Sequence, residues 1–161
     1  MKLQVIDRRL VKRVLGRWQE IADEGQFPRR SQIGPDVFGE DWANCFVVDL
    51  DPTLGRSRLA YVGETIKDPA WPSDIQPHVG DCHDGTLLKF AVTRIPALLK
   101  RRAPINFGGY EVRGDGHVVY RSILLPLAED GQTIDGVLAA INHRVAAATR
   151  GLHGEPLDVA V

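Results

Sequence analysis

One segment restricts the fold of this chain more than any other, because both of its alternating faces are apolar. It runs from His117 to Leu127. Successive side chains of a strand point to opposite faces of a sheet, so a strand of this kind is expected to meet water on neither face. Its two sets are Val119, Ile123 and Leu125 on one face and Val118, Tyr120 and Leu124 on the other. The sheet that contains this strand must therefore be covered on both sides.

Four further apolar segments are expected to complete that sheet. Apolar runs bounded by turn residues predict strands near 44–50, 57–63, 105–112, 117–127 and 134–145. The hairpin signals Gly114-Asp115-Gly116 and Glu129-Asp130-Gly131 join the last three strands. The predicted fold class is α+β, with one five-stranded antiparallel sheet.

A basic amphipathic helix is predicted at the N-terminus, from Ile6 to about Glu24. Its apolar residues recur every three or four positions, the period of one helix face. Residues 1–30 carry eight Lys and Arg against four Asp and Glu, so the other face is basic. One interpretation is that such a helix binds a membrane surface or an acidic partner. The favoured interpretation is that it docks on its own domain or on a second copy of the chain. We expect the apolar stripe of this helix to cover the outer sheet face and to contact a second copy in a homodimer. The stripe consists of Leu10, Val14, Trp18 and Ile21.

The remaining segments divide the chain into an N-terminal helix over 1–26, a domain over 27–148 and a flexible tail over 149–161. Phe27 to Asp36 contains two prolines and a glycine, which predicts an irregular connector. Residues 64–84 predict a loop with one or two short helical turns. Thr86 to Arg102 returns to helical spacing, with a kink or restart at Pro96.

Composition and charge exclude several classes of protein. The chain has 161 residues and a net charge of −1, so the whole lacks the basic footprint of a nucleic-acid binder. Its apolar stretches are far shorter than the roughly 20 residues of a membrane-spanning helix. The N-terminal residues do not resemble a secretory signal, and two cysteines fit a reducing compartment. We therefore expect a cytoplasmic protein.

Several stretches resemble a family of small, single-domain bacterial proteins, largely alphaproteobacterial, that are related to PAS domains. After the first helix, Phe27-Pro28-Arg29-Arg30-Ser31-Gln32-Ile33-Gly34-Pro35 is similar to the family's proline, arginine, isoleucine and proline signature. Leu124-Leu125-Pro126-Leu127, then Asp130-Gly131 and Ile134-Asp135-Gly136-Val137-Leu138, resemble its end pattern. The resemblance covers about residues 15–145. The chain departs from it at Ala60, where the family tends to carry arginine, and at Glu64, where it tends to carry threonine.

The resemblance implies a sensory or protein-interaction module in bacterial signalling, with a helical crossover over the sheet. Its partners would be other signalling proteins and a second copy of the chain. A small ligand would bind between the inner sheet face and the crossover helix. The residues expected to line that pocket are Phe90, Arg94, Tyr110, Tyr120 and His143. Of the motif residues, Pro28, Arg30 and Pro35 are expected to have structural roles. Arg29 and Arg30 have the chemistry to grip a carboxylate or a phosphate. The favoured interpretation is that Arg30, rather than Arg29, ties the connector to backbone carbonyls.

Motifs for catalysis and cofactors are weak. The sequence has no nucleophile elbow, phosphate loop or zinc-protease helix. His78, Asp81, Cys82, His83 and Asp84 are dense in metal-ligating types, but neighbouring side chains rarely converge on one ion. Asn44-Cys45-Phe46 lacks the arginine that follows the cysteine in flavin-binding relatives. We therefore expect no metal, haem or flavin. The alternative to the sensory module is a small enzyme that uses the cupped sheet as a substrate pocket, with an Asp or His as acid or base.

Overall fold

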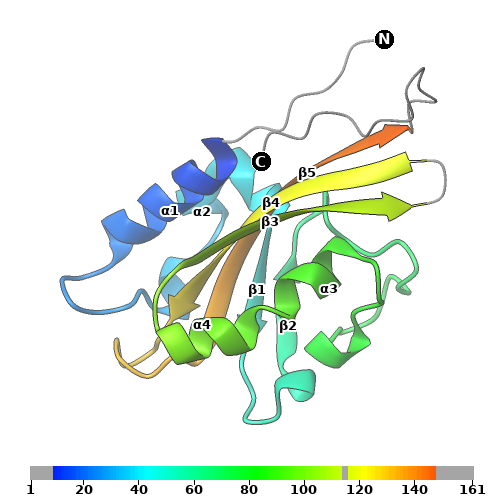
Figure 1. Cartoon of the computed structure of the whole chain (residues 1–161). Helices are drawn as coiled ribbons and strands as arrows, with labels where there is room; N and C mark the ends of the chain where they lie inside the picture. Colours follow the sequence, from blue (N-terminus) through cyan, green and yellow to red (C-terminus); the bar gives the residue numbers. More distant parts are fainter. Residues whose placement is uncertain (1–8, 114–115, 148–161) are drawn as a thin grey trace.

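The computed structural model describes residues 9–113 and 116–147, and within them the chain forms one antiparallel sheet with helices on both faces (Figure 1). The strand order is β2-β1-β5-β4-β3. The predicted five-stranded α+β fold is confirmed, with each strand within about two residues of its expected position. The strands are β1 Cys45–Asp49, β2 Arg58–Val62, β3 Ile105–Arg113, β4 Gly116–Leu127 and β5 Gly136–Ala147. The β3–β4 turn residues 114–115 and the predicted tail over 149–161 lie outside the described residues.

Short helices connect and cover the strands. Residues 93 and 94 separate the two crossover helices, and Pro96 lies in the first turn of the second. The predicted restart is therefore confirmed, and Thr86 caps the first of these helices by accepting a hydrogen bond at Oγ1 from the Lys89 amide. The α-helices are α1 Arg9–Ile21, α2 Pro35–Phe38, α3 Leu87–Val92 and α4 Ile95–Arg101. The 3₁₀ helices are η1 Arg30–Gln32, η2 Gly39–Asn44, η3 Leu54–Arg56 and η4 Val79–Asp81.

Helix α1 covers the outer face of the sheet (Figure 1). Val14 is fully buried and Trp18 is 8% exposed, while Ile21 is half-buried. The Trp18 indole donates a 2.9 Å hydrogen bond to the Pro126 carbonyl of β4. The outer cluster also contains sheet residues of β1, β4 and β5: Cys45, Val47, Ile123, Leu125, Leu127, Leu138 and Ala140.

The α1 stripe is buried within a single chain. Leu10, Val14 and Trp18 are buried by the sheet and by the segment that follows α1. Arg13 adds a two-point ion pair, with both contacts to the Asp41 carboxylate at 2.8 Å. Covering the outer face therefore does not require a second copy, and the homodimer stays a prediction.

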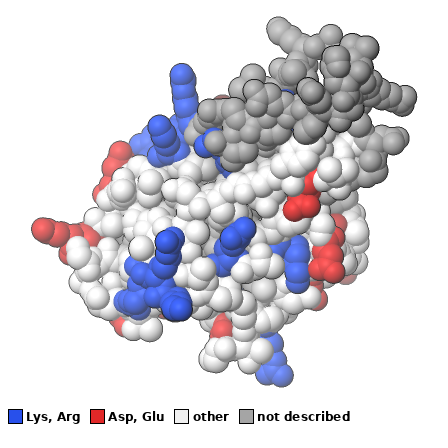
Figure 2. Space-filling view, viewed as in Figure 1, with Lys and Arg blue, Asp and Glu red and all other residues white. Residues whose placement is uncertain are grey.

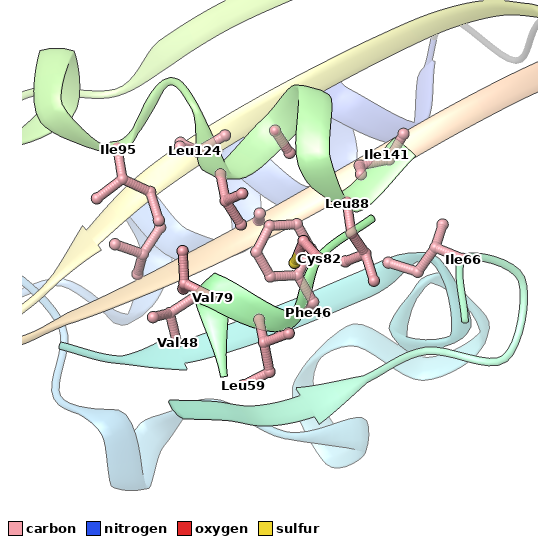
Figure 3. Close-up of a cluster of buried hydrophobic side chains, with 14 of the residues drawn as sticks. Phe46, Val48, Leu59, Ile66, Val79, Cys82, Leu88, Ile95, Leu124 and Ile141 are labelled. Carbon is pink, nitrogen blue, oxygen red and sulfur yellow. The ribbon is translucent and has the colours of Figure 1, made fainter. Parts of the chain in front are cut away.

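The inner face of the sheet packs against α3 and α4 (Figure 3). The two apolar faces of β4 separate as the alternation predicts, because Ile123 and Leu125 join the outer cluster whereas Tyr120 and Leu124 join the inner one. The labelled members of the inner cluster are Phe46, Val48, Leu59, Ile66, Val79, Cys82, Leu88, Ile95, Leu124 and Ile141.

The connector between α1 and α2 is fixed to the β4–β5 turn. The Phe27 amide donates to the Gly131 carbonyl, and the Ala128 amide donates to the carbonyl of buried Pro28, both at 2.9 Å. Pro35 opens α2 at its first position. This is a position where proline's missing amide costs no helical hydrogen bond.

Arg30 contacts a carboxylate, and not the backbone carbonyls that the sequence analysis predicts. Its Nε lies 3.8 Å from Asp49 Oδ1 at the end of β1. Arg58 holds the other Asp49 oxygen at 2.6 Å. Both partners of the Arg30 pair are more than a third exposed, so the tie is weak.

The charged surface is divided into separate groups. Figure 2 shows basic side chains over the end of α4, where Lys100 and Arg101 lie in the last turn. Positive side chains at a helix C-terminus are favourable, because they oppose the partial negative charge there. None of the helices in residues 9–113 and 116–147 has the length and apolar character needed to cross a membrane.

Candidate ligand site on the inner face of the sheet

Three aromatic rings and one guanidinium meet between the sheet and the crossover helices. The rings of Phe90 and Tyr120 stack, with centroids 5.1 Å apart and planes at 9°. Phe107 of β3 meets Tyr120 edge-on at 6.3 Å. The guanidinium carbon of Arg94 lies 5.1 Å from the centroid of the Phe107 ring, a cation–π distance. We call these four residues the aromatic cluster.

Local backbone features bring these side chains together. Phe90 lies on α3, and Arg94 lies in the break between α3 and α4. Gly109 of β3 stands opposite Tyr120 of β4. A Cβ at Gly109 would overlap the Tyr120 hydroxyl oxygen, so the missing side chain is what lets the tyrosine ring lie on the strand.

Tyr120 is the most enclosed polar group of the aromatic cluster, at 5% exposed. Burial raises the pKa of its hydroxyl above the ordinary value, the negative charge of Glu111 raises it further, and Arg94 opposes the change. The hydroxyl is therefore neutral at physiological pH and can donate a hydrogen bond.

Four of the five residues predicted to line the pocket lie on the inner face. His143 of β5 is the cross-strand partner of Tyr120, which places it beside the aromatic cluster. Tyr110 lies on the opposite face, where its ring is 4.9 Å from that of His117. The alternation of β3 accounts for this placement, because Phe107 packs against the inner core and Tyr110 is three residues further along the strand.

A ligand of the aromatic cluster would bind at its rim. Leu88, Ile95 and Leu124, next to the aromatic cluster, are fully buried and occupy the interior (Figure 3). Arg94 is exposed at the surface. Aromatic faces beside a guanidinium suit a planar group that carries a carboxylate, because the rings stack and the guanidinium pairs with the charge.

Comparisons with protein-family models, with curated proteins and with solved structures found no match to this chain. The assignment of the site therefore rests on its geometry and chemistry.

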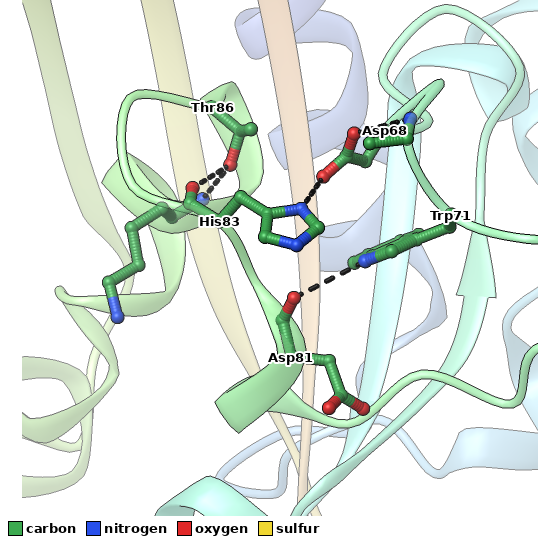
Figure 4. A network of polar contacts seen from close by, with 7 residues as sticks. Asp68, Trp71, Asp81, His83 and Thr86 are labelled. Carbon is green, nitrogen blue, oxygen red and sulfur yellow. Dashed lines mark hydrogen bonds and ion pairs between the residues drawn. The ribbon is translucent and has the colours of Figure 1, made fainter.

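A second polar site, missed at the sequence level, fixes the long loop between β2 and α3 (Figure 4). His83 Nδ1 lies 2.5 Å from Asp68 Oδ2, and the Asp68 side chain is almost fully buried. The Trp71 indole donates to the Asp81 carbonyl at 3.2 Å. The hydrogen bond with His83 lowers the pKa of Asp68, and a second bond from the Ala70 amide adds to this. The buried carboxylate is therefore charged and oriented.

The side chains of the stretch dense in metal-ligating residue types make separate contacts. His83 faces Asp68, whereas His78 Nδ1 lies 3.6 Å from Asp81. Among the residues that the structure describes, no three His, Cys, Asp or Glu side chains are grouped so as to hold a metal ion. Cys82 is buried, and burial raises its pKa to about 11.

Cys45 has the environment of a core residue. Burial, with a smaller contribution from the charge of Asp41, raises the pKa of its thiol to about 12. Its Sγ donates to the Asp41 carbonyl at 3.3 Å. A thiol with so high a pKa is a poor nucleophile at neutral pH.

Proposed function

We propose that this chain is a cytoplasmic PAS-like sensory module, which binds a small ligand at the aromatic cluster and reports it to other signalling proteins. The observation that carries the proposal is the meeting of Phe90, Arg94, Phe107 and Tyr120 between the sheet and the crossover helices. The resemblance to PAS-related proteins and the five-stranded antiparallel sheet support the same reading.

The ligand class follows from the chemistry of the aromatic cluster. A planar aromatic carboxylate would lie against Phe107 and take Arg94 as its counter-ion. Arg94 lies in the break between α3 and α4. A ligand that draws this guanidinium away from Phe107 therefore acts on the junction of the two helices, and their outer surfaces are what a partner protein would contact.

Native mass spectrometry of freshly purified protein, followed by an NMR titration with benzoate, tests the proposal. We expect a retained small molecule, and benzoate-induced shifts at Phe90, Phe107 and Tyr120. Arg94→Gln should weaken benzoate binding about ten-fold or more, because a hydrogen bond between charged groups is lost. Arg101→Gln, an exposed arginine in the last turn of α4, should bind like the parent. A protein that carries no small molecule and shows no shifts at these residues contradicts the proposal.

The same mass spectrum tests the homodimer. Two-fold dimers are the commonest oligomers of soluble proteins, and we expect a species of twice the mass of the chain. A single species of chain mass at micromolar concentration contradicts the dimer and leaves the ligand proposal standing.

The enzyme alternative has its own specific observation, the Asp68–His83 pair. A buried carboxylate that orients a histidine through Nδ1 leaves Nε2 to exchange protons, as in general acid–base catalysis. His83→Gln should leave benzoate binding unchanged under the sensory proposal. A catalytic role instead requires an activity that is lost in His83→Gln and kept in His78→Gln.

A further inference from the structure

A groove runs between α1 and strands β3 and β4, and its lining also includes Phe107 and Ser122. Its volume is about 480 Å³, within the range of about 300–1,000 Å³ that is usual for small-molecule sites. Gly108 of β3 stands opposite Arg121 of β4. Gly108 contributes no side chain to this part of the groove. The lining includes Val11, Lys12 and Leu15 from α1 and Asn106, Gly108 and Arg121 from the sheet.

Arg121 connects this groove to two further nitrogen-bearing side chains on the same sheet face. Arg144 of β5 pairs in register with Val119, and His117 and Arg121 lie two residues before and after Val119 on β4. Side chains two residues apart on a strand share a face. His117, Arg144 and Arg121 therefore surround Val119 on the outer face.

These three side chains carry buried nitrogens that lack a hydrogen-bond partner within the described part of the chain. The atoms are His117 Nε2, Arg121 Nε and Arg144 Nε. His117 is 4% exposed and Arg144 is 8% exposed. A buried donor without an acceptor is costly, and a buried charge without a counter-ion is more so. An anion that reached Arg121 would give one of these donors an acceptor.

The charges around the groove are not balanced locally. None of its described lining residues is acidic, and Lys12 adds a second cation from α1. The neighbouring Arg13, in contrast, has Asp41 as its partner. The groove thus combines apolar walls from Val11 and Leu15 with a positive charge on either side.

We propose that this groove binds an amphiphilic monocarboxylate. Its carboxylate pairs with Arg121 and Lys12, and its apolar chain lies along Val11 and Leu15. The inference goes beyond the proposed function, because neither Arg121 nor Lys12 belongs to the aromatic cluster, although Phe107 lies at the groove as well. It gives the chain a second ligand site, next to the helix that covers the outer face.

Isothermal titration calorimetry on the full chain tests this with three probes: octanoate, octanol and inorganic phosphate. Octanol keeps the chain and removes the charge, whereas phosphate keeps charge and removes the chain. We expect octanoate to bind at least about ten-fold more tightly than either. In NMR spectra octanoate should shift the amides of Asn106 and Gly108.

Variants assign the binding to the groove. Arg121→Gln should weaken octanoate binding about ten-fold or more, and Arg121→Lys should restore part of it. Lys12→Gln changes an exposed side chain, so it provides the same test if Arg121→Gln fails to fold. Lys100→Gln, on α4, is the matched control and should bind like the parent.

Three outcomes overturn the inference. Equal affinity for octanol shows an apolar site without charge recognition, and equal affinity for phosphate shows a bare anion site. Octanoate binding that is unchanged in Arg121→Gln and in Lys12→Gln, but weakened in Arg94→Gln, places the ligand at the aromatic cluster instead. That last result would leave the proposed function intact.

Discussion

Val14 offers the sharpest test of how α1 is held on the sheet. Its side chain is fully buried in the outer cluster. Val14→Ala removes two buried methyl groups at about 0.8 kcal/mol each, or about 1.6 kcal/mol before any cost of the cavity that remains. A chain of this length loses roughly 2–4 °C of melting temperature per kcal/mol. We therefore expect Val14→Ala to melt at least about 3–6 °C below the parent, and further below it if the cavity persists.

Thermal melting followed by circular dichroism measures this difference, with Gln19→Ala as the control. Gln19 is exposed on the same helix, so its change should move the melting temperature by less than about 2 °C. Val14→Glu extends the series by placing a charge in the outer cluster. We expect it to undock α1 or to prevent folding, because an unpaired buried charge costs several kcal/mol.

The result that refutes this reasoning is equal melting of Val14→Ala, Val14→Glu and the parent. The stripe would then contribute nothing to the fold. Helix α1 would be free to bind a membrane surface or an acidic partner, which is the alternative reading of its basic face. Light scattering on the same samples separates a lost dimer from a lost helix contact.

Three further predictions concern the connector, α1 and the Asp68 site. Arg30→Ala should lower the unfolding free energy by about 0.5 kcal/mol and Arg29→Ala by less, since only Arg30 faces Asp49 and that pair is partly exposed; equal urea midpoints would contradict this. Gly16→Ala should raise the melting temperature by about 2 °C, because alanine favours the helix and its Cβ meets no atom within 4 Å; a lower melting temperature would count against it. Asp68→Asn should cost about 0.5–1 kcal/mol at about pH 7, a value reduced for the exposure of its histidine partner. Because the folded pKa of Asp68 is lowered, its contribution to stability is complete above about pH 4 and is lost as the pH falls through that lowered pKa. Urea titrations measure the difference in unfolding free energy between Asp68→Asn and the parent. A difference that stays the same in acid would exclude the Asp68 carboxylate as its source.

The strands could be predicted because local sequence determines them strongly. Turn residues follow each apolar run, and the doubly apolar run from Val118 to Leu127 required two covering layers. The two layers are α1 on one side and α3 with α4 on the other. The helix break could also be predicted, because Pro96 cannot lie in a helix interior without the loss of a hydrogen bond.

The polar sites could not be predicted to the same extent, because they depend on contacts between distant segments. Alternation alone does not say which face of β3 is inward, so Tyr110 was grouped with residues on the other side of the sheet. Arg30 carried a motif signal, but its partner Asp49 lies on a strand that no local pattern connects to it. Asp68 carried no signal, since a single aspartate in a loop is ordinary until His83 is placed beside it.

The position of β5 in the sheet determines when a growing chain can fold. Within the described residues, strand β5 lies between β1 and β4 and joins the β1–β2 hairpin to the β3–β4 hairpin. A two-stranded hairpin is marginally stable by itself, and synthesis proceeds at about 5–20 residues per second. Until Gly136–Ala147 leaves the ribosome, β1 and β4 each have an unpaired edge rich in apolar residues. Until then these two edges are available to pair with each other or with another chain, which is the hazard that β5 removes when it inserts between them.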